Sequence, residues 1–366
     1  MNSKKSTVSA AEFAAAIKKV GAVLKKSQFP ALENICVEFT ESGCRLKGTD
    51  LAVYMTAEIP AEGNTFSFVF SNTANIVRAC AHYEGDLEFE LWNTGKEQKL
   101  TVRTADKGGE FPVYDTKMYP EFPAAEPMQR YTVKADTLYE RVKRVSYASG
   151  ISESKPVLSG VRFEGNHVWC VDGMRLAVSD DEAMNVEPRF IVPAKNMEHL
   201  KAFGSSSVEI AVEKKYVMFS GGGLTLICRQ LATDDTMKIE NIVPKVIRES
   251  YYIDRAKYLD TLKYLGEFTR GRGIVYVRFC NGTLTLFDKH TDSMYNAKVE
   301  TDGACEIPYT FELRYMKDAL EQFPGGKYLR IDVSGESTPF VVSADGVKMK
   351  ALILPARVRQ EVRDAA

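Results

Sequence analysis

The clearest pattern in the chain is one arrangement of apolar and polar residues that occurs three times. In each copy, a run that alternates apolar and polar residues ends at a polar turn, and a second such run follows. The first runs are Val37-Glu38-Phe39, Val161-Arg162-Phe163 and Val277-Arg278-Phe279. Alternation around a Gly or Asn turn is typical of half-buried antiparallel strands. The sequence therefore predicts three hairpins, about 120 residues apart, which is the length of a domain.

Amphipathic helices are predicted on both sides of each hairpin. Apolar residues at helical spacing indicate helices ahead of the hairpins, over residues 10–26, 134–148 and 254–268. A second helix follows each hairpin, where a polar or proline-containing leader precedes an apolar stripe. These second helices begin near Ser71, Pro193 and Thr310. Each copy thus predicts helix, strands, helix and strands, with one face of each helix packed on a sheet.

Three units of similar plan fill the chain, so we expect an α+β protein of three domains. The length of 366 residues exceeds what one hydrophobic core usually organises. A proline-rich segment over residues 119–127 ends the first unit, and Val243-Pro244-Lys245 marks the second junction. The predicted domains are residues 1–126, 127–245 and 246–358, followed by a charged C-terminal tail over residues 359–366.

Composition narrows the class of protein. No apolar run is long enough to span a bilayer, and the polar N-terminus lacks the apolar core of a secretory signal, so we expect a cytoplasmic protein. Seven scattered cysteines without a C-x-x-C spacing predict reduced core thiols. Four histidines far apart in the sequence give no zinc motif. The sequence therefore predicts neither a metal nor a cofactor.

Three segments, in order along the repeat, resemble the beta subunit of bacterial DNA polymerase III, the family of DNA sliding clamps. They are residues 29–35 followed by Gly48-Thr49-Asp50-Leu51, residues 156–161 followed by residues 171–177, and residues 352–358. The likeness covers nearly the whole chain. Two departures are Met174, where the family usually has histidine, and residues 236–239, where a Phe-Pro-Asp-Tyr-like stretch is usual. The chain also continues past Val358 to Ala366.

The resemblance implies a processivity factor and not an enzyme. Two chains would join head to tail into a six-domain ring, with helices inside and sheets outside, that encircles double-stranded DNA and tethers the replicative polymerase. A net charge of −1 does not oppose this function, because a ring holds DNA by topology and needs cations only on its inner face. Other implied partners are the clamp loader, repair polymerases and further proteins with clamp-binding motifs. The implied location is the cytoplasm, in association with the nucleoid.

Two sites follow from the resemblance. The first is a peptide groove between the second and third domains, with apolar walls suited to a short segment. Its residues are Leu158, Val171, Gly173, Met174, Arg175, Leu176, Met237, Ile242, Tyr315, Pro339, Leu352, Leu354, Pro355, Ala356, Arg357 and Val358. In that groove, Arg175 is suited to hold a backbone carbonyl or a carboxylate. Plain core packing is the alternative for the aliphatic members.

The second predicted site is a set of cations on the inward helices that meet phosphates without sequence preference. The set is Lys18, Lys25, Lys26, Arg78, Arg141, Arg144, Lys195, Lys201, Lys257, Lys263, Arg314 and Lys317. A solvated helix face is the alternative for each of them. Acidic residues dilute the set in the third domain. We place the contact that closes the ring at the strand over residues 100–104 and the helix over residues 258–268, with Leu262 and Leu265 in it.

Two other functions stay open at this stage. An enzyme would need a catalytic motif, but Gly221-Gly222-Gly223 lacks the Lys-Ser/Thr of a phosphate loop and no Gly-x-Ser-x-Gly elbow occurs. A clamp-like scaffold or inhibitor that has lost replication is the second possibility, and the departures at Met174 and residues 236–239 favour it.

Overall fold

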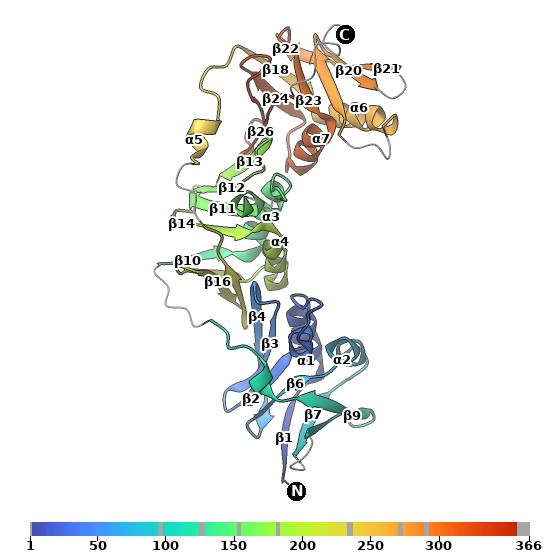
Figure 1. Cartoon of the computed structure of the whole chain (residues 1–366), viewed down its shortest axis with the longest axis vertical. Coiled ribbons are helices and arrows are strands. Elements are labelled where there is room, and N and C mark those ends of the chain that lie inside the picture. Colours follow the sequence, from blue (N-terminus) through green and yellow to red (C-terminus); the bar gives the residue numbers. More distant parts are fainter. Residues whose placement is uncertain are drawn as a thin grey trace. The chain divides into compact units, whose positions relative to one another are not determined.

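The computed structural model describes residues 2–93, 98–123, 129–151, 155–180, 184–232, 237–269, 274–288 and 293–356. Contacts between residues divide the chain into two units, each described by itself (Figure 1). Unit 1 comprises Met1–Tyr139 and Asn196–Gln230, and unit 2 comprises Glu140–Lys195 and Leu231–Ala366. The three domain ranges expected from the sequence divide the chain differently and stay a prediction.

One antiparallel sheet organises unit 1. Within the described residues it has 13 strands, in the order β10-β15-β16-β17-β4-β3-β2-β6-β9-β8-β7-β1-β5. Its strands are β1 (Asn2–Ser9), β2 (Cys36–Thr40), β3 (Gly43–Thr49), β4 (Val53–Ile59), β5 (Glu62–Gly63), β6 (Phe66–Phe70), β7 (Asp86–Asn93), β8 (Gln98–Arg103), β9 (Gly108–Tyr114), β10 (Gln129–Lys134), β15 (Ser207–Val212), β16 (Tyr216–Gly221) and β17 (Leu224–Arg229). Pairing of β4 with β17 joins the first sequence repeat to the second through main-chain hydrogen bonds.

Two helices of unit 1 lie side by side, and one of them packs on the sheet. Helix α1 (Ala10–Gly21) contacts α2 (Thr73–Cys80) and the strands β3 and β4 (Figure 1). Phe13, Ile17 and Val20 are fully buried, which confirms that part of the predicted apolar stripe, but the helix ends at Gly21, before the predicted end at Lys26, and Leu24 is half-buried beyond it. Glycine at Gly48 on β3 permits this packing, because a Cβ there would lie 2.8 Å from the carbonyl oxygen of Val20. The helix therefore sits against the strand at backbone distance.

Unit 2 contains two sheets. Within the described residues, one has nine strands in the order β14-β11-β12-β13-β26-β25-β24-β18-β22, and the other has four, β21-β20-β19-β23. Their strands are β11 (Gly160–Gly165), β12 (His167–Val171), β13 (Arg175–Asp180), β14 (Val186–Pro193), β18 (Glu249–Asp254), β19 (Tyr276–Cys280), β20 (Thr283–Asp288), β21 (Ser293–Lys298), β22 (Thr301–Gly303), β23 (Tyr309–Glu312), β24 (Tyr328–Val333), β25 (Phe340–Ser343) and β26 (Met349–Ile353). Here β13 pairs with β26, which joins the second repeat to the third.

The remaining helices are short or amphipathic. They are η1 (Pro30–Glu33), η2 (Thr116–Met118), α3 (Ala135–Ser146), η3 (Pro156–Ser159), α4 (Ala194–Met197), η4 (Glu198–Phe203), α5 (Ile239–Ile242), α6 (Arg255–Glu267) and α7 (Leu313–Gln322). In unit 2, α6 packs against α7. Asp254 caps α6 by accepting hydrogen bonds from the backbone N–H groups of Ala256 and Lys257, at 3.0 and 3.1 Å. This cap explains why the helix begins there.

All three predicted hairpins are confirmed. They are β2–β3, β11–β12 and β19–β20, each paired antiparallel. In the third hairpin the two turn residues, Asn281 and Gly282, have φ of 48° and 68°. Two successive positive φ values define the tight turn that matches the twist of a hairpin, and Asn-Gly is the sequence that best tolerates it.

The expected ring-closing contact is wrong in its residues. Leu262 and Leu265 are 0% exposed, and they belong to the core that α6 and α7 form with the sheets of unit 2. Strand β8 pairs with β7 on one side and β9 on the other, so it has no open edge, and Leu100 is buried. A helical stripe predicts that a face is buried but does not say against what. Charges at Leu262 and Leu265 would therefore disrupt the core of unit 2.

Other expectations concern the thiols, metals and membranes. All seven cysteines are free, and five of them are buried. Among the described residues there is no group of three or more His, Cys, Asp or Glu side chains that could hold a metal ion. In the same part of the chain, no helix has the length and apolar character needed to cross a membrane.

Candidate partner site and DNA-facing surface

An apolar cluster in unit 2 brings together many residues of the predicted peptide groove. We call it the apolar cluster. Its buried members are Trp169, Val171, Leu176, Val178, Ile239, Val341 and Leu352, and the half-buried Leu158, Met237, Ile242 and Val243 pack against them. The cluster therefore combines a buried floor with a rim that solvent reaches, as a site for an apolar peptide segment requires.

The members that the sequence analysis missed are Trp169, Val178, Ile239, Val341 and Val243. Trp169 and Val171 alternate on β12, and Leu176 and Val178 alternate on β13. Since side chains two apart in a strand point to the same face, alternation could have identified Trp169 and Val178. Val341 comes from β25, a strand that joins the cluster only through the pairing of β25 with β26.

A tight turn between β12 and β13 borders the cluster. The carboxylate oxygen Oδ1 of Asp172 accepts hydrogen bonds from the backbone N–H groups of Met174 and Arg175, both at 2.9 Å. Gly173 has a φ of 92°, and a Cβ there would meet no atom within 4 Å. The glycine is thus required by backbone conformation and not by crowding. The N–H of Leu354 donates to the carbonyl of Met174 at 2.8 Å, which fixes the end of β26 to this turn.

Arg175 is buried and fully engaged with its own chain. Its Nε donates to Asp172 at 3.0 Å and its Nη1 to Asp318 on α7 at 2.7 Å. The guanidinium also lies over the rings of Tyr147 and Tyr315, 5.3 and 4.6 Å from their centroids. Burial lowers the pKa of Arg175, but the hydrogen bond to Asp318 and the two aspartate charges outweigh burial and raise it. The carboxylates that Arg175 holds are therefore those of Asp172 and Asp318 of its own chain.

The other predicted groove residues lie around the cluster or outside the described chain. Met174 is 42% exposed, and Leu354 is half-buried. Tyr315 packs against the core of unit 2 rather than in the cluster. Pro339, Pro355 and Ala356 are half-buried, while Arg357 and Val358 lie outside the described residues.

The predicted DNA-facing cations are mostly exposed. Exposed members are Lys18, Lys25, Lys26, Arg78, Lys195, Lys201, Lys257, Lys263 and Arg314, and half-buried members are Arg141, Arg144 and Lys317. In unit 1, Lys25 forms an ion pair with Asp50. Burial raises the pKa of Asp50, but the Lys25 hydrogen bond and two backbone N–H groups outweigh it and lower the pKa. Within the described residues Lys18, Lys26 and Lys201 have no ion-pair partner.

His199 on η4 is affected by the charges of Lys25 and Asp50. Burial lowers the pKa of its imidazole, and the charge of Lys25 lowers it further. The charges of Asp50 and Glu198 oppose this effect and raise the pKa of His199, so the positive charge around η4 is balanced in part by carboxylates within unit 1. In unit 2, three cations of the set pair with carboxylates. These pairs are Lys257–Glu300 at 2.8 Å, Lys263–Glu321 at 4.0 Å and Arg314–Glu312 at 3.2 Å.

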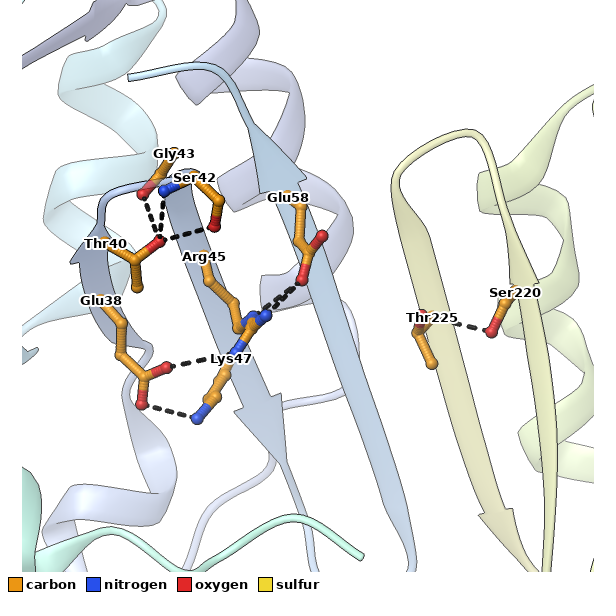
Figure 2. A network of polar contacts seen from close by, with 9 residues as sticks. All are labelled: Glu38, Thr40, Ser42, Gly43, Arg45, Lys47, Glu58, Ser220 and Thr225. Atoms are coloured by element: carbon orange, nitrogen blue, oxygen red, sulfur yellow. Dashed lines mark hydrogen bonds and ion pairs between the residues drawn. The ribbon is translucent and has the colours of Figure 1, made fainter. Parts of the chain in front are cut away.

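The sheet face of unit 1 that points away from α1 carries balanced charges. Figure 2 shows Arg45 and Lys47 on β3 between Glu38 on β2 and Glu58 on β4. Arg45 pairs with Glu58 at 2.7 Å, and Lys47 pairs with Glu38 at 2.6 Å. Each cation of this network has an anionic neighbour, so the face offers little net attraction for phosphate. Within the described residues, Lys18, Lys26 and Lys201 on the helical side of unit 1 have no such anionic neighbour.

The comparisons with known proteins agree with one another. Residues 132–234 match the family model of the DNA polymerase III beta subunit, central domain. The beta sliding clamp of Bacillus subtilis (strain 168) is 22% identical, with 92% of this chain and 94% of the relative covered. That of Staphylococcus epidermidis is 23% identical over the same shares. Among solved structures, a putative DNA polymerase III beta subunit from Eubacterium rectale has a TM-score of 0.87 at 16% identity, covering 97% of this chain and 100% of that one. The sliding clamp of Bacillus subtilis has a TM-score of 0.86 at 18% identity, covering 98% and 100%.

The fold is therefore that of a sliding clamp, an α+β architecture of repeated helix and sheet units. The resemblance that three sequence segments predict is confirmed, since residues 132–234 match the central-domain model of the DNA polymerase III beta subunit and beta sliding clamps match 92% of the chain.

Proposed function

We propose that the chain is a DNA sliding clamp, which encircles duplex DNA and tethers the replicative polymerase. The observation that carries this proposal is the structural likeness to sliding clamps over 97–98% of the chain. The apolar cluster, the exposed cations and the open sheet edges of the chain itself support it. Tethering raises the effective concentration of the polymerase at its template and needs no catalytic group. In a bacterial-type clamp this work takes place in the cytoplasm, at the nucleoid.

Two open sheet edges support ring closure between two copies. Over residues 108–111, β9 pairs with β8 alone, because β6 meets β9 only at Val113 and Tyr114. Strand β21 pairs only with β20 within the described residues. An exposed edge is a template for another strand. We infer that β9 of one copy pairs with β21 of the other, in a head-to-tail contact that closes after two copies.

The apolar cluster is the docking site in this proposal for a short segment of the polymerase, the clamp loader or a repair polymerase. Leu158, Met237 and Ile242 form its accessible rim. Burial of one leucine-sized side chain stabilises a complex by about 2 kcal/mol, so two or three anchors contribute about 4–6 kcal/mol of the roughly 8 kcal/mol that micromolar binding requires, and polar contacts of the peptide supply the remainder. Met174 borders the turn without a charge, so it favours an apolar neighbour on the peptide.

The helical side of unit 1 is the stronger DNA contact in this proposal. Its unpaired lysines attract phosphates without reading sequence, and salt weakens such contacts. Three cations of unit 2, Lys257, Lys263 and Arg314, share their charge with carboxylates, which supports a looser contact at those residues. Loose contacts suit a ring that must move along the duplex.

Negative-stain electron microscopy of the full chain at micromolar concentration tests the architecture. Rings with a central hole wide enough for duplex DNA are expected. Compact particles without a hole would contradict the clamp function and favour a scaffold or inhibitor.

Leu354→Glu tests the partner site. Leu354 is half-buried beside the apolar cluster, so the change should weaken polymerase binding at least tenfold and leave the rings intact. Leu176 is unsuitable for this purpose, because it is 1% exposed and a charge there would unfold the unit. Tyr328→Glu is a matched control, since it places the same charge on a 52% exposed residue of unit 2 outside the cluster. Equal polymerase affinity of the two variants would remove the groove assignment.

A further inference from the structure

The turn that borders the apolar cluster has a counterpart in unit 1. There, Oδ1 of Asp50 accepts hydrogen bonds from the N–H groups of Ala52 and Val53, at 3.0 and 2.8 Å. The N–H of Asp50 donates to the carbonyl of Val53 at 3.2 Å. Leu51 has a φ of 69°, which is rare for a side chain of this size. Residues 172–175 of unit 2 make the same three hydrogen bonds around a residue with positive φ.

The neighbouring strand completes the equivalence. In unit 1 the N–H of Arg229 donates to the carbonyl of Ala52 at 3.1 Å. In unit 2 the N–H of Leu354 donates to the carbonyl of Met174 at 2.8 Å. Strand β17 pairs antiparallel with β4 in the first case, and β26 pairs antiparallel with β13 in the second. Backbone geometry at the edge of the predicted peptide site is therefore present twice.

The side chains around the turn of unit 1 are aromatic and apolar. Tyr54 directly follows the turn on β4, and its ring lies 6.3 Å from that of Tyr216 and 5.0 Å from that of Phe122. Leu51 is 47% exposed, with its backbone held by the hydrogen bonds of the turn. Tyr54 is buried, whereas Tyr216 and Phe122 are half-buried. A fixed, exposed leucine near these rings is a surface that a partner can cover without reorganising the protein.

Three cations border this surface. Arg229, Lys214 and Lys215 are exposed, and within the described residues none of them has an ion-pair partner. They lie at the same end of the sheet, because Tyr216 pairs with Arg229 in the strand register and the N–H of Gln230 donates to the carbonyl of Lys215 at 2.8 Å. Burial raises the pKa of the Tyr54 hydroxyl and the charge of Arg229 opposes that rise, so the guanidinium acts on the ring.

We propose that Leu51, Tyr54, Tyr216, Arg229, Lys214 and Lys215 form a second docking surface, which binds a short acidic peptide segment carrying one apolar side chain. The proposal rests on the proposed function, because the equivalence is to the partner site of a clamp. The occupant must differ in charge from that of the apolar cluster. Arg229 occupies the place of Leu354, so this surface attracts carboxylates where the other buries hydrocarbon.

The test uses the full chain with Leu354→Glu, in which the apolar cluster is blocked. This protein is used to select peptides from a phage-displayed library of random heptapeptides. Selected peptides are then synthesised, and their Kd is measured by fluorescence anisotropy. The expected peptides carry a net negative charge, and their affinity falls as salt is raised from 50 to about 200 mM, because the attraction is between exposed charges.

Two variants connect the peptides to the surface. Arg229→Glu in the same background is expected to raise Kd at least tenfold, and Leu51→Gly about threefold. Lys107→Glu is the control, since it reverses an exposed cation of unit 1 in the turn between β8 and β9. Circular dichroism of each variant verifies the fold.

Several results would overturn the proposal. They are a library that yields no binder, binders without negative charge, and a Kd that changes less than twofold in Arg229→Glu. Displacement of the peptides by an oligothymidylate with equal affinity would also overturn it, because the surface would then bind nucleic acid. The two proposals can fail separately. If the microscope shows rings but the library yields no binder, the second docking surface is wrong and the clamp function stands. If the microscope shows no rings, the clamp function is wrong.

Discussion

Removal of Arg175 tests whether the buried cation organises unit 2. In Arg175→Ala the guanidinium disappears, and with it the hydrogen bonds to Asp172 and Asp318 and the stacking on two tyrosine rings. The side chain of Arg175 is 9% exposed, that of Asp172 is 12% exposed and that of Asp318 is 29% exposed. Both carboxylates therefore lose a counter-ion in a place where water compensates only in part.

The magnitude follows from this burial. Removing one partner of a buried ion pair costs about 3–5 kcal/mol. Asp172 keeps two backbone N–H donors, and Asp318 regains some water, so we expect a loss near the lower limit, about 3 kcal/mol. In Arg175→Lys the charge remains, but one ammonium cannot span both carboxylates and stack on the rings, so we expect about half of that loss.

Urea unfolding of the full chain measures the effect. The sequence has two tryptophans, Trp92 in unit 1 and Trp169 in unit 2, so a Trp92→Phe background makes fluorescence report unit 2. The slope of the transition should stay constant, which shows that stability alone has changed. The matched control is Arg330→Ala. Arg330 donates to Asp332 at 2.8 Å, and its side chain is 39% exposed. The carboxylate of Asp332 is 11% exposed, but it keeps the hydrogen bond from the Ser250 hydroxyl at 2.6 Å, so we expect a loss of about 1 kcal/mol.

A particular result would refute the reasoning. If Arg175→Ala costs no more than Arg330→Ala, burial does not distinguish the two pairs, and the position of Arg175 between two carboxylates has no special effect on the fold.

Three further predictions use the same full-length protein. Gly173→Ala should lower the free energy of unfolding by about 1 kcal/mol, through the positive φ alone, and Gly48→Ala by about 2–3 kcal/mol, because the new Cβ would overlap atoms of Val20. The midpoints of urea unfolding measure both losses. Because the pKa of His199 is lowered in the folded protein, the imidazole takes up a proton more readily in the unfolded chain, and the free energy of unfolding should fall as pH drops below about 6.5. His199→Gln should make the melting temperature depend less on pH in that range. Lys26→Glu should shorten retention on nicked circular DNA at least threefold, and Lys257→Glu, at a lysine already paired, less than twofold.

The elements that depend on local order could be predicted from the sequence. The hairpins follow from alternation and turn residues, and the stripe of Phe13, Ile17 and Val20 follows from helical spacing, since both signals lie within a few residues. What the stripe of Leu262 and Leu265 packs against could not be predicted, because periodicity contains no information about the neighbouring element.

The features that could not be predicted depend on contacts between residues far apart in the sequence. Arg175 and Asp318 are 143 residues apart, and no local pattern connects them. Pairing of β13 with β26 decides which aliphatic residues share the apolar cluster, so Val341 could not be assigned from its own segment. Six residues predicted from the family likeness, namely Leu158, Val171, Leu176, Met237, Ile242 and Leu352, belong to the apolar cluster, but the likeness could not say that Arg175 donates to carboxylates of its own chain.

The two Asp-centred turns hold the main chain in the same way at two places where strands of different repeats meet. In each, one carboxylate oxygen accepts two backbone N–H groups, from Ala52 and Val53 in the first and from Met174 and Arg175 in the second. The residues that follow the two aspartates differ, because Leu51 carries an exposed side chain and Gly173 carries none. One main-chain frame therefore presents two chemically different surfaces on a single chain.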